Sequence, residues 1–226
     1  LTAREILCLL RGGFADGALG RWRTLHEISV IGAFLSHQEI ETSKRYLLSR
    51  DCQAYKAAKQ YKEYEVRANL ETFNEDTLAI MKIKFDHIVS EYGPEIAEEW
   101  GWAASIINKS RVNFSDIERY EGLDHWRPRY KWACQDTHAN HRPQNVMLGA
   151  SEANEDVIIA MGSNSGMTDP AQMAAISLTI MASAFILLEP NIDRLASLMA
   201  MNELQGEVGE TFVRTEKETY EAHLKE

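Results

Sequence analysis

A chain of 226 residues, 45% of them hydrophobic, is long enough to bury a full core as one domain. Its formal net charge of −10 argues against a general nucleic-acid coat protein, although it leaves room for a local basic groove. The three cysteines are scattered and form no CxxC pair, so we interpret them as reduced thiols of a cytoplasmic protein.

The sequence predicts neither a secretory signal peptide nor a membrane span. The first ten residues are short for a signal peptide and contain Arg4 and Glu5. The longest apolar run, residues 171–188, contains Gln172 and several serines and threonines, so a buried helix explains it better than a membrane span. We therefore expect no membrane partner.

Apolar residues recur at helical spacing through most of the chain. We predict an all-α, multi-helix bundle with a long buried central helix. Residues 1–204 would form a single domain, and residues 205–226 a charged C-terminal helix that faces a protein partner. The predicted helices cover residues 2–10, 17–36, 38–69, 74–92, a helix from 94 through 102, a short one within 108–122, 124–140, 169–201 with an interruption or kink at Pro190, and 206–224.

Residues 142–169 are the least helical part of the chain. We predict a minor loop or two-stranded insert near 145–160, with residues 147–148 and 157–159 as the strands. Asp169 then caps the helix that follows.

The predicted helix at 38–69 has one basic side, which is either a solvated face or a contact for a polyanion. Its cations are Lys44, Arg45, Arg50, Lys56, Lys59, Lys62 and Arg67.

The most informative polar residues lie on the central helix, which is apolar nearly all round. Arg23 and Glu27 are four residues apart, so their side chains can pair on one face. His26 lies beside them. Buried charges are costly unless they are paired and hydrogen-bonded, so we expect any functional site to include this cluster.

A second cluster lies on the predicted helix at 124–140. Lys131 and His138 are seven residues apart and share a face, and the helix begins with Arg127 and Arg129. A histidine can exchange a proton near neutral pH, and nearby cations would hold a phosphodiester. We assign Arg23, Glu27, Lys131 and His138 as candidate catalytic residues. The candidate substrate-binding residues are His26, Arg127, Arg129 and Tyr130.

Two other interpretations of these residues stay open. The Arg–Glu–His cluster is also typical of a hydrogen-bond network that only stabilises a core. A metal site would use Cys134, His138 and His141, spaced four and three residues apart, with further ligands from elsewhere. No glutamate precedes a histidine by three residues in a core-like helix, as a di-metal helical bundle requires. We therefore assign no metal and no cofactor.

Three runs, GFADGALGRWRTLHEISVIGAFL, RYLLSRDCQAYKAAKQY and YKWACQDTHAN, together resemble a bacterial family of unknown function numbered 5677. The resemblance covers most of residues 1–188. It implies an all-helical protein with an Arg-x-x-x-Glu motif on an early buried helix, here Arg23 and Glu27. It also implies a late helix that carries a tyrosine and a histidine.

That arrangement is similar to the higher-eukaryote and prokaryote nucleotide-binding (HEPN) helical domains. Many of these are metal-independent RNases of toxin and phage-defence systems, with a site completed across a dimer. Their signature is an arginine, four to six residues, and a histidine. His138 matches the histidine, whereas Lys131 stands in place of the arginine and cannot form its bidentate contact with a phosphate.

These observations lead to three hypotheses for the function. The first is a phage-defence or toxin-type RNase that binds RNA or a nucleotide and acts as a homo-oligomer, such as a dimer. The substrate's own 2′-hydroxyl would attack, so that no metal is needed. The second is a non-catalytic helical module that regulates a larger defence system. The third is a di-metal carboxylate protein.

Overall fold

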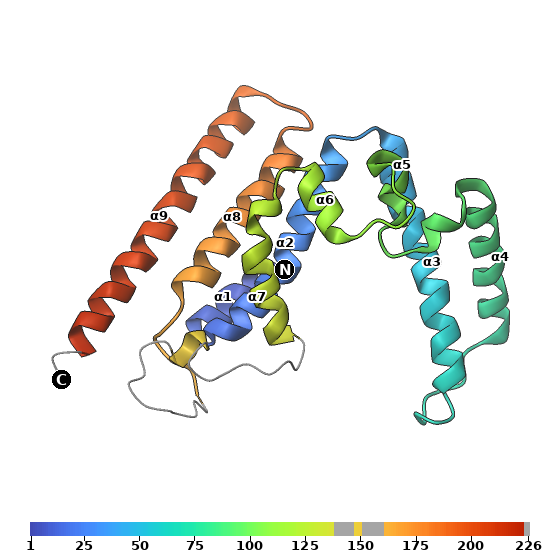
Figure 1. The fold of residues 1–226 in the computed structure, drawn as a ribbon, viewed down its shortest axis with the longest axis horizontal. Coiled ribbons are helices and arrows are strands. Elements are labelled where there is room, and N and C mark those ends of the chain that lie inside the picture. The colour runs from blue at the N-terminus through green and yellow to red at the C-terminus, as the bar shows by residue number, and fades with distance from the viewer. Residues whose placement is uncertain (138–146, 151–160, 224–226) are drawn as a thin grey trace. The chain divides into compact units, whose positions relative to one another are not determined.

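The computed structural model describes residues 1–137, 147–150 and 161–223. Over these residues it contains helices and turns but no strand, which confirms the predicted all-α class (Figure 1). The α-helices are α1 (Thr2–Arg11), α2 (Ala15–Ser36), α3 (Ile40–Tyr64), α4 (Glu75–Tyr92), α5 (Ala104–Ile107), α6 (Phe114–Tyr120), α7 (Arg127–Thr137), α8 (Thr168–Ile186) and α9 (Ile192–His223). Short 3-10 turns cover Pro94–Ala97, Gly101–Ala103, Asp124–Trp126 and Leu148–Ala150.

The chain divides into two compact units. The first consists of Leu1–Ser36 and Leu123–Glu226, and the second of His37–Gly122. The predicted boundary at residue 204 stays a prediction, and the two units are described separately below.

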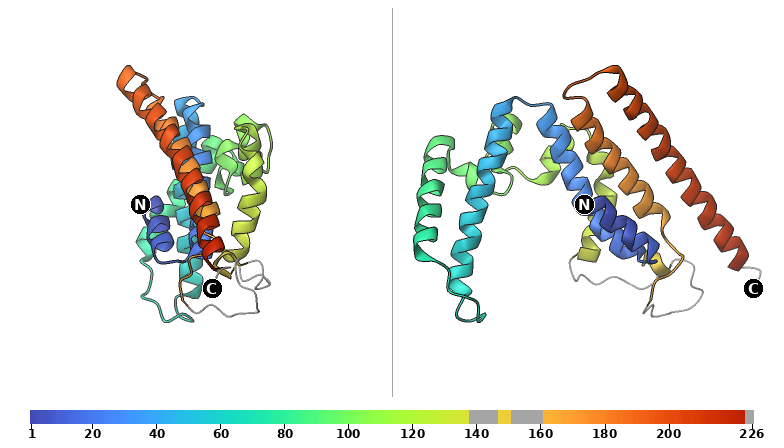
Figure 2. Two further views of the ribbon diagram at one scale, coloured as in Figure 1. Left: turned by 90° about the vertical axis from the view of Figure 1, so that its left-hand side faces the viewer. Right: turned by 180° about the vertical axis from the view of Figure 1, so that it is seen from behind.

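Helix α2 is the central helix of the first unit and contacts α1, α7 and α8. Figures 1 and 2 both show α8 between α2 and α9. The burial of α2 is one-sided, which differs from the prediction, because Ile28 is 40% exposed. Its buried residues are Ala15, Ala18, Leu19, Trp22, Leu25, His26, Ser29, Val30, Ala33 and Phe34.

The structure corrects three predictions in the C-terminal half. Leu148–Ala150 forms a 3-10 turn in place of the first predicted strand, and residues 157–159 lie outside the described part. Asp169 does not cap α8. It lies inside the helix, whose N-cap residue is Met167, and it pairs with Arg129 instead. The predicted break before Gly206 is also wrong, because α9 continues through it.

The second unit is built on α3 and α4, which enclose a small core. Its buried members are Cys52, Ile88, Ile96 and Ala97. The helix predicted from Pro94 through Trp102 is wrong. Two 3-10 turns form instead, because Glu98 between them has an extended backbone, with φ −78° and ψ 158°.

Within the described residues, α8 is the one helix long and apolar enough to cross a membrane. Core helices of soluble proteins have the same length and composition. Here α8 packs between α2 and α9, and the Trp22 Nε1–H donates a hydrogen bond to Ser177 Oγ on α8 at 2.9 Å. The cytoplasmic location stays a prediction.

Candidate functional site

Helices α2 and α7 contact each other, and this contact, the α2–α7 seam, brings residues of the two polar clusters found in the sequence together. Arg23 and Glu27 pair on α2, with 3.1 Å between a guanidinium nitrogen and Glu27 Oε1. The Tyr130 hydroxyl on α7 accepts a hydrogen bond from Arg23 Nε at 3.1 Å and donates one to Glu27 Oε1. Each of these three side chains therefore contacts the other two, although Tyr130 is more than 100 residues away in sequence.

The charges in this triad are stabilised by their mutual contacts. Burial and the hydrogen bond to Glu27 raise the pKa of the Tyr130 phenol above its usual range, so the phenol keeps its proton at neutral pH. Burial alone would lower the pKa of Arg23, but the hydrogen bond with Tyr130 and the charge of Glu27 outweigh it and raise that pKa. The side chains of Arg23 and Glu27 are 25% and 24% exposed, so the pair borders solvent.

Two further candidate residues flank the Tyr130 ring. The guanidinium carbon of Arg127 lies 5.0 Å from the ring centroid, within the range of a cation–π contact. His26 lies 5.8 Å from it, centroid to centroid, and 5.2 Å from Trp22. His26 is 1% exposed and lies in the core of this structure, and its assignment to substrate binding stays a prediction.

Arg129 and Lys131 do not join the triad. An Arg129 guanidinium nitrogen lies 2.7 Å from Asp169 Oδ2, so this side chain links α7 to the start of α8. Lys131 is exposed, and no contact of its side chain with Arg23 or Glu27 is present in the described structure. A residue next to Tyr130 is turned about 100° around the helix, which explains why Lys131 faces away.

A cavity of about 570 Å³ lies along α2, and none of the three triad residues is among those that line it. Gly20 and Thr24 line it, and they lie three residues from Arg23 and Glu27 respectively, on neighbouring positions of the helix. Thr137 of α7 also lines it. His138, the proposed general acid and base, follows Thr137 in the sequence but lies outside the described residues.

Sequence reasoning missed the role of Asp16, which is one of the residues that line this cavity. Its carboxylate accepts hydrogen bonds from the backbone N–H groups of Leu148 and Gly149, at 2.9 and 3.0 Å. Asp16 lies in the first turn of α2, which begins at Ala15, and its carboxylate holds the turn at residues 148–150. No local signal identifies this role, because the two partners are more than 130 residues apart.

The basic side of α3 in the second unit is extensively paired. Lys62 contacts Glu65 and Glu75 at 2.9 and 2.5 Å, Arg45 donates to Ser105 Oγ at 2.9 Å, and Lys44 contacts Glu41 at 3.3 Å. The carboxylate partners of Lys44 and Lys62 reduce the charge that these two lysines offer to a polyanion, whereas the contact of Arg45 with the neutral Ser105 does not. The predicted polyanion contact stays a prediction.

A metal centre requires several convergent ligands. In the described ranges, no group of three or more His, Cys, Asp or Glu side chains could hold a metal ion. Of the three candidate metal ligands named from the sequence, Cys134 is among the described residues, whereas His138 and His141 lie outside them. No observation favours the di-metal hypothesis.

A family model matches residues 1–156, which include α1–α7 and therefore the whole α2–α7 seam. The chain belongs to the family of unknown function DUF5677. This confirms the predicted family, although the match ends before α8 and is shorter than the resemblance predicted to residue 188. No curated protein and no solved structure matches the chain. The likeness of DUF5677 to HEPN domains and its bacterial origin stay predictions.

The importance of the triad for stability can be tested by Tyr130→Phe, which removes only the hydroxyl. We expect the free energy of unfolding to fall by about 1–3 kcal/mol, because Arg23 and Glu27 each lose a hydrogen-bond partner in a largely buried place. Urea unfolding followed by circular dichroism measures this. Tyr64→Phe on α3, where the tyrosine is 44% exposed, is the control and should be nearly neutral. An equal change in the free energy of unfolding for both substitutions would show that the Tyr130 hydroxyl does not stabilise the contact between α2 and α7.

The same variant should also change the pH dependence of stability. The folded pKa of Tyr130 lies above that of the unfolded chain, so the stabilisation is complete below the unfolded pKa and falls as pH rises through the folded pKa. The difference in stability between wild type and Tyr130→Phe should therefore shrink as the pH rises above about 10, the ordinary pKa of a tyrosine phenol.

Proposed function

We propose that the protein is a metal-independent endoribonuclease of the toxin or phage-defence type, similar to HEPN domains. The observation that carries this proposal is the Arg23–Glu27–Tyr130 triad at the edge of solvent. A separate cavity along α2 reaches Thr137 of α7. A guanidinium in this position suits a phosphodiester, and the sequence supplies a histidine directly after Thr137.

In the proposed reaction, His138 removes the proton of a ribose 2′-hydroxyl, and that oxygen attacks the adjacent phosphorus. The bond from phosphorus to the 5′-oxygen breaks, and this oxygen leaves with the proton that the protonated His138 returns to it. The products are a 2′,3′-cyclic phosphate and a 5′-hydroxyl. Arg23 neutralises the phosphate charge, Glu27 and Tyr130 hold Arg23 in place, and Lys131, exposed on α7, contacts the RNA backbone outside the triad.

The test is cleavage of labelled single-stranded RNA in the presence of EDTA. We expect products ending in a cyclic phosphate, and no cleavage of the same strand with 2′-deoxyribose throughout. His138→Ala should lower the rate by at least about 100-fold, as expected for loss of a general acid and base. His87→Ala, an exposed histidine on α4, is the matched control. Full activity of His138→Ala, or no binding of any RNA by the wild type, would refute the proposal.

The second candidate is a non-catalytic helical module, and the contacts that Arg23, Glu27 and Tyr130 make with one another favour it. In that case the triad only holds α7 against α2. Substituting Arg23 or Glu27 would then lower the free energy of unfolding. A fully buried pair would cost about 3–5 kcal/mol, and the cost here should be smaller because both side chains are partly exposed. If Arg23 and Glu27 instead serve catalysis, their substitution should leave the free energy of unfolding unchanged or raise it. Thermal unfolding of Arg23→Ala and Glu27→Ala distinguishes the two.

We further propose that α9 faces a protein partner, such as a second copy of the chain. Its apolar residues Met199, Val213 and Tyr220 are 73%, 54% and 47% exposed. Their spacing of multiples of seven places them along one side of the helix. A dimer in sedimentation velocity that Val213→Glu dissociates would support this surface, and an unchanged profile would contradict it.

A further inference from the structure

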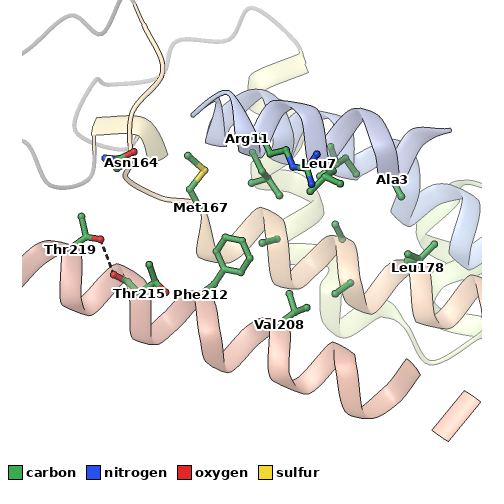
Figure 3. Close-up of a pocket in the computed structure, with 15 residues that line it drawn as sticks. Ala3, Leu7, Arg11, Asn164, Met167, Leu178, Val208, Phe212, Thr215 and Thr219 are labelled. Carbon is green, nitrogen blue, oxygen red and sulfur yellow. Dashed lines mark hydrogen bonds between the residues drawn. The ribbon is translucent and has the colours of Figure 1, made fainter. Parts of the chain in front are cut away.

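We propose that the first unit binds a free long-chain carboxylic acid in a cavity between α1, α8 and α9. The cavity has a volume of about 490 Å³ (Figure 3). This lies within the range of small-molecule sites, which are mostly apolar and contain a few polar groups that orient the ligand. The inference is independent of the proposed RNase activity, because the cavity does not include the α2–α7 triad.

The apolar part of the cavity suits an alkyl chain. Its floor on α8 is made of small residues, Ala171, Ala174 and Ala175, which leave room between the helices. Larger apolar side chains form the walls, among them Leu7 of α1 and Phe212 of α9. A flexible unbranched chain can follow such a wall, and each CH₂ group that it buries contributes to binding.

Polar groups gather toward one end. Figure 3 shows Asn164, Thr215 and Thr219 at this end, and Ala3 and Leu178 at the other. The two threonines are on α9, where Thr219 Oγ1 donates to the Thr215 carbonyl oxygen at 2.9 Å. A ligand with one polar head and one apolar tail matches a lining of this mixed character.

The charge of the lining selects an acid over an alcohol or an amine. Among the fifteen residues that line the cavity, all of them in the described ranges, Arg11 is the charged one. It lies at the end of α1 and is exposed. Figure 3 shows Arg11 beside Leu7, away from Asn164 and the threonines, so we place the acid head on this guanidinium, with which a carboxylate can form charge-assisted hydrogen bonds.

The first experiment is calorimetric titration of the full chain with butanoate, octanoate and dodecanoate. We expect saturable binding of one dodecanoate, no measurable binding of butanoate, and an affinity that rises by about fourfold for each added CH₂ group. Dodecanol should bind more weakly than dodecanoate. Absence of dodecanoate binding, or equal binding of all three acids, would overturn the proposal.

Variants locate the tail of the ligand. Ala175→Phe fills the floor of the cavity, and we expect it to abolish dodecanoate binding. The matched control is Ala200→Phe on an exposed position of α9, which should bind as the wild type does. If Ala175→Phe does not fold, Val208→Phe narrows the cavity from α9 and should weaken binding. Unchanged binding in a folded filling variant would place the ligand elsewhere and refute the site.

A second pair of variants locates the head. Arg11→Gln should weaken dodecanoate binding about tenfold, as expected for loss of a charged hydrogen bond, and leave dodecanol binding unchanged. Arg4→Gln, also exposed on α1, is the control and should change neither. An equal effect of Arg11→Gln on acid and alcohol would contradict the assigned orientation. If the filling variants change the sedimentation coefficient while dodecanoate does not bind, the cavity is an interface between copies and the proposal fails.

Discussion

Replacing Trp22 by alanine should lower the free energy of unfolding of the first unit by about 3–5 kcal/mol. Trp22 lies on α2 and is 1% exposed, so its removal leaves a large cavity in the core. It also removes the hydrogen bond from Trp22 Nε1–H to Ser177 Oγ, at 2.9 Å, which links α2 to α8. The ring of His26, 5.2 Å away between centroids, loses a packing partner as well.

Amide hydrogen exchange of α2 and α8 measures this effect in the unit where it arises. Ser177→Ala is the control that removes the hydrogen bond but keeps the indole ring. We expect it to cost about 1–3 kcal/mol, because the indole N–H stays buried without its partner. If Trp22→Ala lowered protection by less than Ser177→Ala, packing around the indole would not be what holds α2 and α8 together.

Replacing Gly101 by alanine should destabilise the second unit by about 3 kcal/mol, at the upper end of what overpacking usually costs. A Cβ atom at Gly101 would overlap the carbonyl oxygen of Glu95, which belongs to the 3-10 turn at Pro94–Ala97. That oxygen is backbone and cannot rotate away as a side chain can. Relief of the clash would therefore move the two turns that pack against α3.

The control for this prediction is Gly206→Ala on α9, where no atom lies within 4 Å of the added methyl group. There the same substitution should stabilise the helix by about 0.5–1 kcal/mol, because alanine has the higher helix propensity. Hydrogen exchange of α3 and α4 for the first variant, and of α9 for the second, measures both. The same sign for both variants would show that close packing at Gly101 is not what requires the glycine.

Local features of the chain were predictable from sequence because they depend on helical periodicity and on the chemistry of helix ends. Asn74 begins α4 as expected, and its side chain accepts a hydrogen bond from the Thr77 N–H at 2.9 Å. The pairing of Arg23 with Glu27 follows from their spacing of four residues. These interactions lie within one or two helical turns, so their geometry hardly depends on the rest of the fold.

Capping was less predictable where a distant group competed for the same side chain. Asp169 and Asp16 are both suited to cap a helix, yet Asp169 pairs with Arg129, and Asp16 holds the backbone of residues 148–149. A carboxylate binds the donors that the fold brings near it, and a guanidinium or two backbone N–H groups can replace the cap.

The sequence by itself determined the all-α class, the position of most helices and the Arg23–Glu27 pair. The tertiary structure decided which side chain completes that pair. Among the neighbouring polar residues of α7, Tyr130 faces α2, Lys131 faces away from it, and Arg129 reaches α8. It also decided that His26 is a core residue. The spacing of residues gives their relative angles around one helix, whereas the face that meets a neighbour depends on how whole helices pack.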